Sequence, residues 1–258
     1  SRKSRSYMLA SERRNKILEQ LQKAGQISTQ SLVRAFDVSE DTVRRDLKEL
    51  AESGVIKKVH GGAVLTSPVP YTHEERQNLN LAAKSAIGRQ AAELIKDKML
   101  VFVDGSTTAL QLIPHLRVDL KATFITHSPL LSQALSHLPD VEIILLGGKL
   151  VKDLLITQAP DSQLIARRYR PDLCVISAHG VNRVAGATVE SFADASIKRE
   201  FAGNSAELVV MAGREKLGFV ATYQIAELDN ISYLITDGSS SEIADLESDR
   251  LTIIKVGE

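Results

Sequence analysis

The stretch VSEDTVRRDLKEL, residues 38–50, decides the fold of the first part of the chain. From Val43 onward its apolar residues recur at i, i+4 and i+7, which is the spacing of one buried helix face. Ser39 stands just before this pattern and is a residue type that caps helix N-termini. We therefore predict a helix over residues 40–52 whose outer face carries mostly basic side chains.

Two shorter helical patterns precede this helix, and a turn signal follows it. The spacing of apolar residues predicts a helix over 11–24 and a second, short helix over about 28–37. Two short apolar runs within 55–65 flank His60-Gly61-Gly62, as in a small hairpin. Three helices followed by a hairpin make a winged helix, with a helix-turn-helix over about 28–47.

Cations are concentrated on the outer face of the third helix and on the hairpin. A run of charge on a surface helix usually keeps it solvated and does no more, and that alternative holds for each side chain taken alone. Here the cations lie on the second helix of a helix-turn-helix, where phosphate contacts give affinity and groups at the helix start read base edges. The predicted contacts to double-stranded operator DNA are Ser39, Glu40, Asp41, Thr42, Arg44, Arg45, Lys48, Lys57, Lys58 and His60.

Glu40 and Asp41 are acidic exceptions at the start of this helix. One interpretation is that they only stabilise the helix dipole, by about 0.3 to 1 kcal/mol. The other is that one of them accepts a hydrogen bond from a cytosine amino group, which would lower general affinity and add specificity. The residues alone leave both interpretations open.

The 258-residue chain has no net charge, with 32 Lys+Arg and 32 Asp+Glu, and this neutrality is a cancellation. Residues 1–66 hold 13 basic and 8 acidic side chains, a net +5, so the remainder carries −5. Such an asymmetry between parts of a chain indicates nucleic-acid or membrane contact by one of them. The positive excess lies where the winged helix is predicted.

Beyond residue 66 the sequence predicts a second domain, of the α/β class. Ser67-Pro68-Val69-Pro70 begins an expected linker over 67–80, because proline interrupts both helices and sheets. A helix is expected over 81–96. Seven short apolar runs then predict a mostly parallel sheet covered on both faces, an αβα sandwich within 81–258. The runs are 99–103, 122–126, 141–146, 173–177, 208–212, 233–236 and 251–256.

Small polar residues follow several of these predicted strands. In parallel sheets ligands bind beyond the carboxyl ends of the strands, where this chain has DGSTT at 104–108, THS at 126–128 and GGK at 147–149. Helix capping, a tight turn or solvation explains each loop alone, but three such loops at one edge predict a phosphate-sized pocket. Neither GxGxxG nor GxxxxGK[ST] occurs, which counts against an ordinary dinucleotide or nucleoside-triphosphate site.

Both parts of the chain resemble the DeoR family of bacterial transcription regulators. The N-terminal resemblance rests on residues 38–47 and on VHGGA at 59–63, and the C-terminal one on segments that include LGG at 146–148 and KLG at 216–218. It implies a sensor domain similar in fold to ribose 5-phosphate isomerase, in a repressor of a carbohydrate-utilisation operon whose effector is a phosphorylated sugar. The phosphate would lie near residues 106–108 and the sugar near the other loops. The expected effector residues are Asp104, Gly105, Ser106, Thr107, Thr108, Thr126, His127, Ser128, Gly148, Lys149, His179, Gly180, Glu190 and Lys198.

The sequence departs from the family pattern where the sugar would be read. His127 stands where the family commonly has Asn, and Ala178-His179 replaces a pair that usually ends in Asp. Gly213-Arg214-Glu215 lacks the Asp that commonly opens this stretch. These departures leave the phosphate expectation in place but make the identity of the sugar unpredictable.

A sugar-phosphate isomerase or deaminase with an added N-terminal domain is the alternative to a regulator without enzymatic activity. Glu190, Asp194 or His179 would then act as general base, and Lys198 would stabilise an enediolate oxygen. Asp194 and Lys198 stand at i, i+4, a spacing that is also explained by a surface ion pair. We expect the regulator.

Composition limits the remaining classes. No apolar run approaches the roughly 20 residues of a membrane span, and SRKSR at 1–5 lacks the apolar stretch of a signal peptide, so a cytoplasmic protein is expected. Cys174, the single cysteine, lies in an apolar run where a buried, inert thiol is expected. His179 has no second ligand at metal-site spacing, so neither metal nor cofactor is expected. A homodimer or homotetramer is expected, because one winged helix offers few base contacts.

Overall fold

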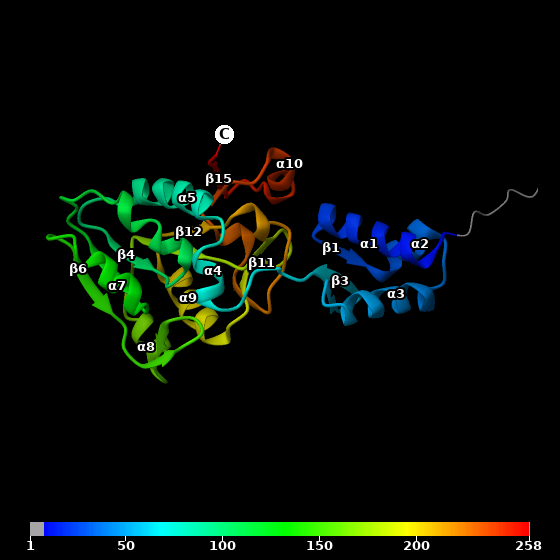
Figure 1. Cartoon of the computed structure of the whole chain (residues 1–258), viewed down its shortest axis with the longest axis horizontal. Coiled ribbons are helices and arrows are strands. Elements are labelled where there is room, and N and C mark those ends of the chain that lie inside the picture. The colour runs from blue at the N-terminus through cyan, green and yellow to red at the C-terminus, as the bar shows by residue number, and fades with distance from the viewer. Residues whose placement is uncertain (1–7, 258) are drawn as a thin grey trace, which may run out of the picture. The chain divides into compact units, whose positions relative to one another are not determined.

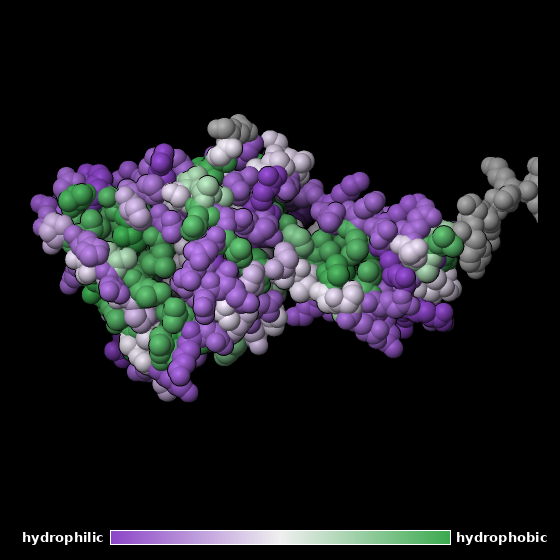
Figure 2. Space-filling view, in the orientation of Figure 1, coloured by the Kyte–Doolittle hydropathy of each residue, from purple (hydrophilic) through white to green (hydrophobic). Residues whose placement is uncertain are grey.

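The structure, a computed structural model, describes residues 8–257 and divides at Thr66 into two compact units (Figure 1). The basic stretch 1–7 lies outside the described residues. Within the described range, no helix combines the length and apolar character needed to cross a membrane. Hydrophilic residues cover most of the visible surface of each unit, with apolar areas between them (Figure 2).

The first unit contains the three predicted helices: α1 (Ala10–Ala24), α2 (Thr29–Phe36) and α3 (Glu40–Glu52). The hydroxyls of Ser28 and Ser39 accept backbone N–H groups of the following turn and so cap α2 and α3. The apolar faces of all three helices are turned inward, because their periodic side chains are fully or almost fully buried. These side chains include Ile17, Leu21, Leu32, Val43 and Leu47.

A three-stranded antiparallel sheet in the order β1-β3-β2 completes this unit. β2 (Ile56–Val59) and β3 (Gly62–Leu65) form the predicted hairpin, and β1 (Gln26–Ser28) is a third strand that the sequence did not indicate. A Cβ on Gly62 would lie 1.9 Å from the carbonyl oxygen of Ile27, so the approach of β1 requires glycine there. The wing is therefore joined to the helical part through β1.

Seven parallel strands form the main sheet of the second unit, in the order β15-β14-β12-β9-β4-β5-β6. The α/β class and the largely parallel sheet are thereby confirmed. The inner strands are buried on both faces, which explains why they read as continuous apolar runs. The strands are β4 (Leu100–Val103), β5 (Thr123–Thr126), β6 (Glu142–Leu145), β9 (Leu173–Ser177), β12 (Glu207–Met211), β14 (Tyr233–Thr236) and β15 (Thr252–Lys255).

Helices cover both faces of this sheet, and alternate residues of each strand enter opposite cores. Val101 and Val103 of β4 enter the core shared with α5 (Leu81–Leu94), α6 (Thr107–Leu110) and α7 (Pro129–Leu135). Phe102 and, on β9, Cys174 enter the core shared with α8 (Ser162–Ala166) and α9 (Phe192–Asn204). Phe102 stacks there on Phe201 with ring centroids 4.0 Å apart. Cys174 is completely buried, as expected.

Short elements surround the main sheet at its carboxyl edge. A small antiparallel sheet in the order β10-β11-β13 covers part of the α9 face, and a two-stranded hairpin, β7–β8, follows β6. α10 (Ser240–Ile243) precedes the last strand. The remaining bounds are β10 (Gly180–Asn182), β11 (Gly186–Val189), β13 (Tyr223–Ala226), β7 (Lys149–Val151) and β8 (Ile156–Gln158).

Residues 67–80, expected as a linker, belong to the second unit instead. The Ser67 N–H donates to the carbonyl of Val220 at 3.0 Å, and the Ser67 hydroxyl donates to the carbonyl of His179 at 2.5 Å. The same segment contains a short helix, α4 (His73–Gln77), which begins with a capping box between Thr72 and Glu75. The prolines therefore end the wing strand, but the chain beyond them is anchored rather than free. We call residues 67–80 the strap.

Candidate functional site

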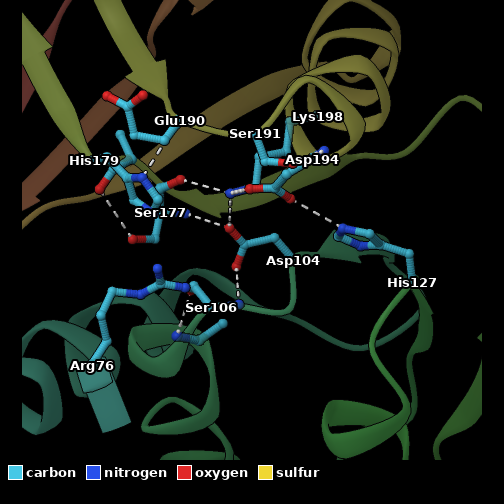
Figure 3. Close-up of polar contacts among 12 residues, drawn as sticks. Arg76, Asp104, Ser106, His127, Ser177, His179, Glu190, Ser191, Asp194 and Lys198 are labelled. Carbon is cyan, nitrogen blue, oxygen red and sulfur yellow. Dashed lines mark hydrogen bonds and ion pairs between the residues drawn. The ribbon is translucent and has the colours of Figure 1, made fainter. Parts of the chain in front are cut away.

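A buried ionic network lies where β4 and β9 end (Figure 3). Asp104 directly follows β4 and is completely buried. One of its oxygens accepts the N–H of Ser177 at 2.8 Å and lies 2.8 Å from Lys198 Nζ, while the other accepts the Ser106 N–H at 3.1 Å. Asp104 thus connects the loops after two neighbouring strands to α9.

Lys198 is the cation of this network. Its ammonium contacts Asp194 at 2.7 Å and donates to the carbonyl of Ser177 at 3.0 Å, so with Asp104 all three N–H groups have acceptors. Burial lowers the pKa of Lys198, but Asp104 and Asp194 outweigh it and hold that pKa above its ordinary value. A surface ion pair between Asp194 and Lys198 is therefore the wrong interpretation, because α9 turns both side chains toward the sheet edge, where they are buried.

A small pocket opens beside the network, and two further cations reach it. Lys216 is buried and donates from Nζ to the Ser177 hydroxyl at 3.2 Å, and Arg76 points from α4 toward the Ser106 and Ser177 loops (Figure 3). Among residues 8–257, neither cation has a carboxylate within ion-pair distance. The pocket is lined by Arg76, Gly105, Ser106, Thr107, Leu154, Ile156, Ser177, His179, Asp194, Lys198 and Lys216.

The electrostatics of the pocket favour an anion. Burial, together with the positive charges of Lys84 and Arg76, lowers the pKa of Lys216 to about 8. A negative ligand beside Lys216 and Arg76 would relieve this mutual repulsion. Lys198 already contacts two carboxylates, whereas Lys216 and Arg76 have none within ion-pair distance among residues 8–257.

His179 adds a neutral hydrogen-bond donor to the pocket. Burial and the neighbouring Arg76 and Lys198 lower the pKa of His179 to about 2, so the ring is uncharged near neutral pH. Its Nδ1 accepts the backbone N–H of Glu190 at 3.3 Å, which places the ring hydrogen on Nε2. A ligand hydroxyl or phosphate oxygen could accept that hydrogen bond.

The winged helix presents the second candidate surface. Its predicted DNA contacts are exposed, apart from half-buried Thr42. The Arg44 guanidinium donates to Glu40 at 2.9 and 2.6 Å, and Lys48 lies 3.8 Å from Glu52, whereas no ion pair involves Arg45 within the described residues. Glu40 therefore has a role that neither sequence interpretation contained, since it holds the side chain of Arg44.

A buried ion pair fixes α3 to α1. The guanidinium of Arg13 donates to both carboxylate oxygens of Asp46, with Nη2 to Oδ1 at 3.2 Å, and both side chains are almost fully buried. Asp46 stands among the charged residues of the recognition-helix motif but faces inward. This fork-like pairing defines the orientation of α3 within the unit.

Both units match models of protein families. A DeoR-like helix-turn-helix domain matches residues 13–69, and a DeoR C-terminal sensor domain matches residues 79–238. The chain belongs to the DeoR family. It is 35% identical over 232 residues to the transcriptional regulator GolR of Listeria innocua, covering 89% of this chain and 91% of GolR. It is 34% identical to the transcriptional repressor GlcR of Bacillus subtilis, covering 89% of each chain.

Membership of the DeoR family makes this chain a DNA-binding transcription regulator and not an enzyme, so the isomerase or deaminase alternative is set aside. Among solved structures, the chain is similar to ribose 5-phosphate isomerase A of Methanocaldococcus jannaschii, with 18% identity, 54% of each chain covered and a TM-score of 0.39.

The pocket contains only part of the predicted effector set. Gly105, Ser106, Thr107, His179 and Lys198 line it, and Asp104 lies directly beneath. The other predicted residues lie outside the lining: Thr108, Thr126, His127, Ser128, Gly148, Lys149, Gly180 and Glu190.

Position in the sheet explains two of these exclusions, and side-chain contacts describe two more. Gly148 and Lys149 follow β6, an edge strand separated from β4 by β5, and they lead away into the β7–β8 hairpin, where Lys149 is exposed. His127 is buried, and its Nε2 donates to a carboxylate oxygen of Asp194 at 3.2 Å. The Glu190 carboxylate accepts the Thr222 hydroxyl at 2.7 Å and points away from the network (Figure 3).

Several pocket residues of this DeoR protein were not among the predicted set. Arg76 lies in the expected linker, although THEE at 72–75 is a capping-box signal that could have revealed α4. Lys216 falls within a segment that carried the family resemblance but was given no role. Leu154 and Ile156, at the β7–β8 hairpin, carry no polar signal that could have placed them in the pocket.

Proposed function

We propose that this DeoR-family protein represses a carbohydrate-utilisation operon and that a phosphorylated sugar in the pocket changes its affinity for operator DNA. The observation that carries the proposal is the pair Arg76 and Lys216, two cations that reach one pocket with no carboxylate partner in the described chain. A phosphate group would place negative charge beside these two cations. GlcR, a relative of similar length, is named a repressor.

The phosphate would bind to side chains more than to backbone. The N–H of Ser106 is already donated to Asp104, so the Ser106 and Thr107 hydroxyls, Arg76 and Lys216 are the groups that contact the phosphate oxygens. Nε2 of His179 would donate to an oxygen of the sugar. Lys198 acts indirectly, because it holds Asp104 and Asp194 in place.

At the operator, α3 of each copy would enter the major groove, with Arg45 and Lys48 on phosphates and Ser39 to Thr42 near base edges. Two or four copies would act together in the cytoplasm. Ligand binding alters operator affinity if it favours one arrangement of the winged helices over another.

A thermal-shift screen of the full chain against sugar phosphates tests the pocket. A ligand at 100 times its dissociation constant should stabilise the protein by about 2.7 kcal/mol. Lys216→Met should remove this stabilisation, whereas Lys152→Met, which removes an exposed lysine outside the pocket lining, should keep it. Operator binding by fluorescence anisotropy, with and without the ligand found, then measures regulation. The proposal fails if no phosphorylated compound stabilises the protein, or if Lys216→Met responds like the unmodified chain.

A further inference from the structure

α9 presents different residues to two separate hollows of the second unit. Asp194 and Lys198 line the effector pocket. Phe192, Arg199 and other residues of the same helix line a groove completed by β13 and by α8, which packs against α9 (Figure 1). α9 therefore lines both the effector pocket and the groove.

Aromatic side chains are exposed along this groove. Phe192 is 63% exposed and Tyr223 is 37% exposed, and their rings meet edge to face with centroids 5.5 Å apart. Leu164 on the neighbouring α8 is 59% exposed. Single exposed apolar residues are ordinary, but contacting aromatic residues beside a groove are typical of a surface that another protein covers. We call Phe192, Tyr223, Leu164 and Arg199 the α9 patch.

The charges around the patch suit a second copy of this chain. In a two-fold dimer the same surface faces itself, so it must carry both signs of charge to be self-complementary. Arg199 is exposed and has no ion-pair partner within residues 8–257, while Glu200, which pairs with Arg167, supplies a carboxylate in the lining of the same groove. A patch of a single sign would instead repel its own copy.

The inference rests on the proposed function, in which the protein recognises an operator. Operator recognition requires at least two winged helices, because one offers few base contacts. The described chain therefore needs a surface that pairs with a second copy. We infer that the α9 patch is the interface between two copies of this chain, and that α9 connects this interface to the effector pocket. A ligand that shifts Asp194 or Lys198 then also shifts Phe192 and Arg199, since all four stand on one helix.

Sedimentation velocity of the full chain over a wide concentration range tests the interface. The unmodified protein should be a dimer, and Phe192→Glu should raise its dissociation constant on the order of 100-fold, because a carboxylate would be buried opposite its own copy. Phe192→Ala should raise the constant by a smaller factor. Val118→Glu, which changes a residue that is 73% exposed and outside the groove lining, should leave the dimer unchanged.

The thermal-shift response to inorganic phosphate serves as the control for folding, because Phe192 is not part of the pocket lining. A monomeric unmodified protein, or a Phe192→Glu variant that remains a dimer, would overturn the interface. Inorganic phosphate should shift the dimer constant of the unmodified protein but not that of Lys216→Met, and equal behaviour of the two would overturn the connection through α9. The oligomer measurement uses no ligand, so failure of every sugar phosphate to bind would leave the interface standing.

Discussion

Lys216 is a cation that titrates within an accessible pH range. Its pKa of about 8 means that the charge needed for an anionic ligand is lost as the pH rises through 8. A phosphate monoester gains its second negative charge above about pH 6. Affinity measured by calorimetry should therefore be highest between about pH 6 and pH 8 and should fall at higher pH. Lys216→Arg, which keeps its charge throughout, should remove the fall above pH 8.

Titration of Lys216 also changes the stability of the ligand-free protein. The folded pKa lies below the ordinary value of 10.5, so between about pH 8 and 10.5 the unfolded chain binds more protons at this position. Lys216 therefore makes stability rise with pH in that window. Urea unfolding of Lys216→Met should lack this rise, and an identical pH profile for both proteins would show that Lys216 is not shifted.

Glu40 and Arg44 form an exposed pair at the start of α3. Glu40→Gln removes a negative charge that would lie near DNA and releases the guanidinium, so affinity for random-sequence DNA should rise and its salt dependence should steepen by up to about one unit. Glu19→Gln makes the same change at an exposed position of α1 and should have a smaller effect. Fluorescence anisotropy over a salt series measures both. Weaker binding of random DNA by Glu40→Gln would contradict the expectation.

At the scale of elements, the strap joins the pocket to the chain that leads into the wing. Ser67 lies two residues beyond Leu65, the last residue of β3. Its hydroxyl donates to the carbonyl of His179, which lines the pocket. Ser67→Ala should leave ligand stabilisation in the thermal-shift assay nearly intact but reduce the effect of the ligand on operator affinity severalfold. Ser132→Ala removes a comparable half-buried hydroxyl that donates to the Pro129 carbonyl in α7, and it should preserve that effect. Equal responses of the two variants would exclude this role for Ser67.

The sequence predicted the elements whose identity is local and periodic. Helices α1 to α3 and α5 follow from the spacing of their apolar residues, and all seven strands of the parallel sheet follow from short apolar runs. β1, β7 and β8 have only three residues each, which is too short for a sequence pattern. These strands form because a partner strand pairs with them. For β1 that partner is β3, where Gly62 permits the approach. The sequence did not predict α4, because Pro68 and Pro70 just before it indicate a linker.

The candidate pocket was predictable to the extent that it follows from strand order. Ser106, Thr107 and His179 are near one another because β4 and β9 are neighbours, and polar residues after adjacent parallel strands meet at the same edge. Arg76 comes from the strap and Lys216 from a turn after β12, and the sequence contains no local pattern that brings these two together. Glu190 follows β11, and its carboxylate accepts the Thr222 hydroxyl and points away from the network, a direction that no local pattern in the sequence indicates (Figure 3).

At the scale of the whole molecule, two compact units of opposite net charge follow one another along the chain. Differential scanning calorimetry of the full chain should show two transitions, because each unit has its own buried core. Every residue of the pocket lining lies beyond residue 66, so a sugar phosphate should raise one transition and leave the other in place. A single transition that moves as a whole with ligand would show that the units unfold together.

The burial of Cys174 has a practical consequence for following such changes in solution. The side chain is completely enclosed in β9, and desolvation raises the pKa of its thiol far above the usual range, so maleimide and methanethiosulfonate reagents should not reach a reactive thiolate in the native protein. Since the sequence contains no other cysteine, a thiol introduced at an exposed position such as Val118→Cys would be the single labelled site. Fluorophores or spin labels could thus be attached to both copies of an assembly without first replacing a native residue.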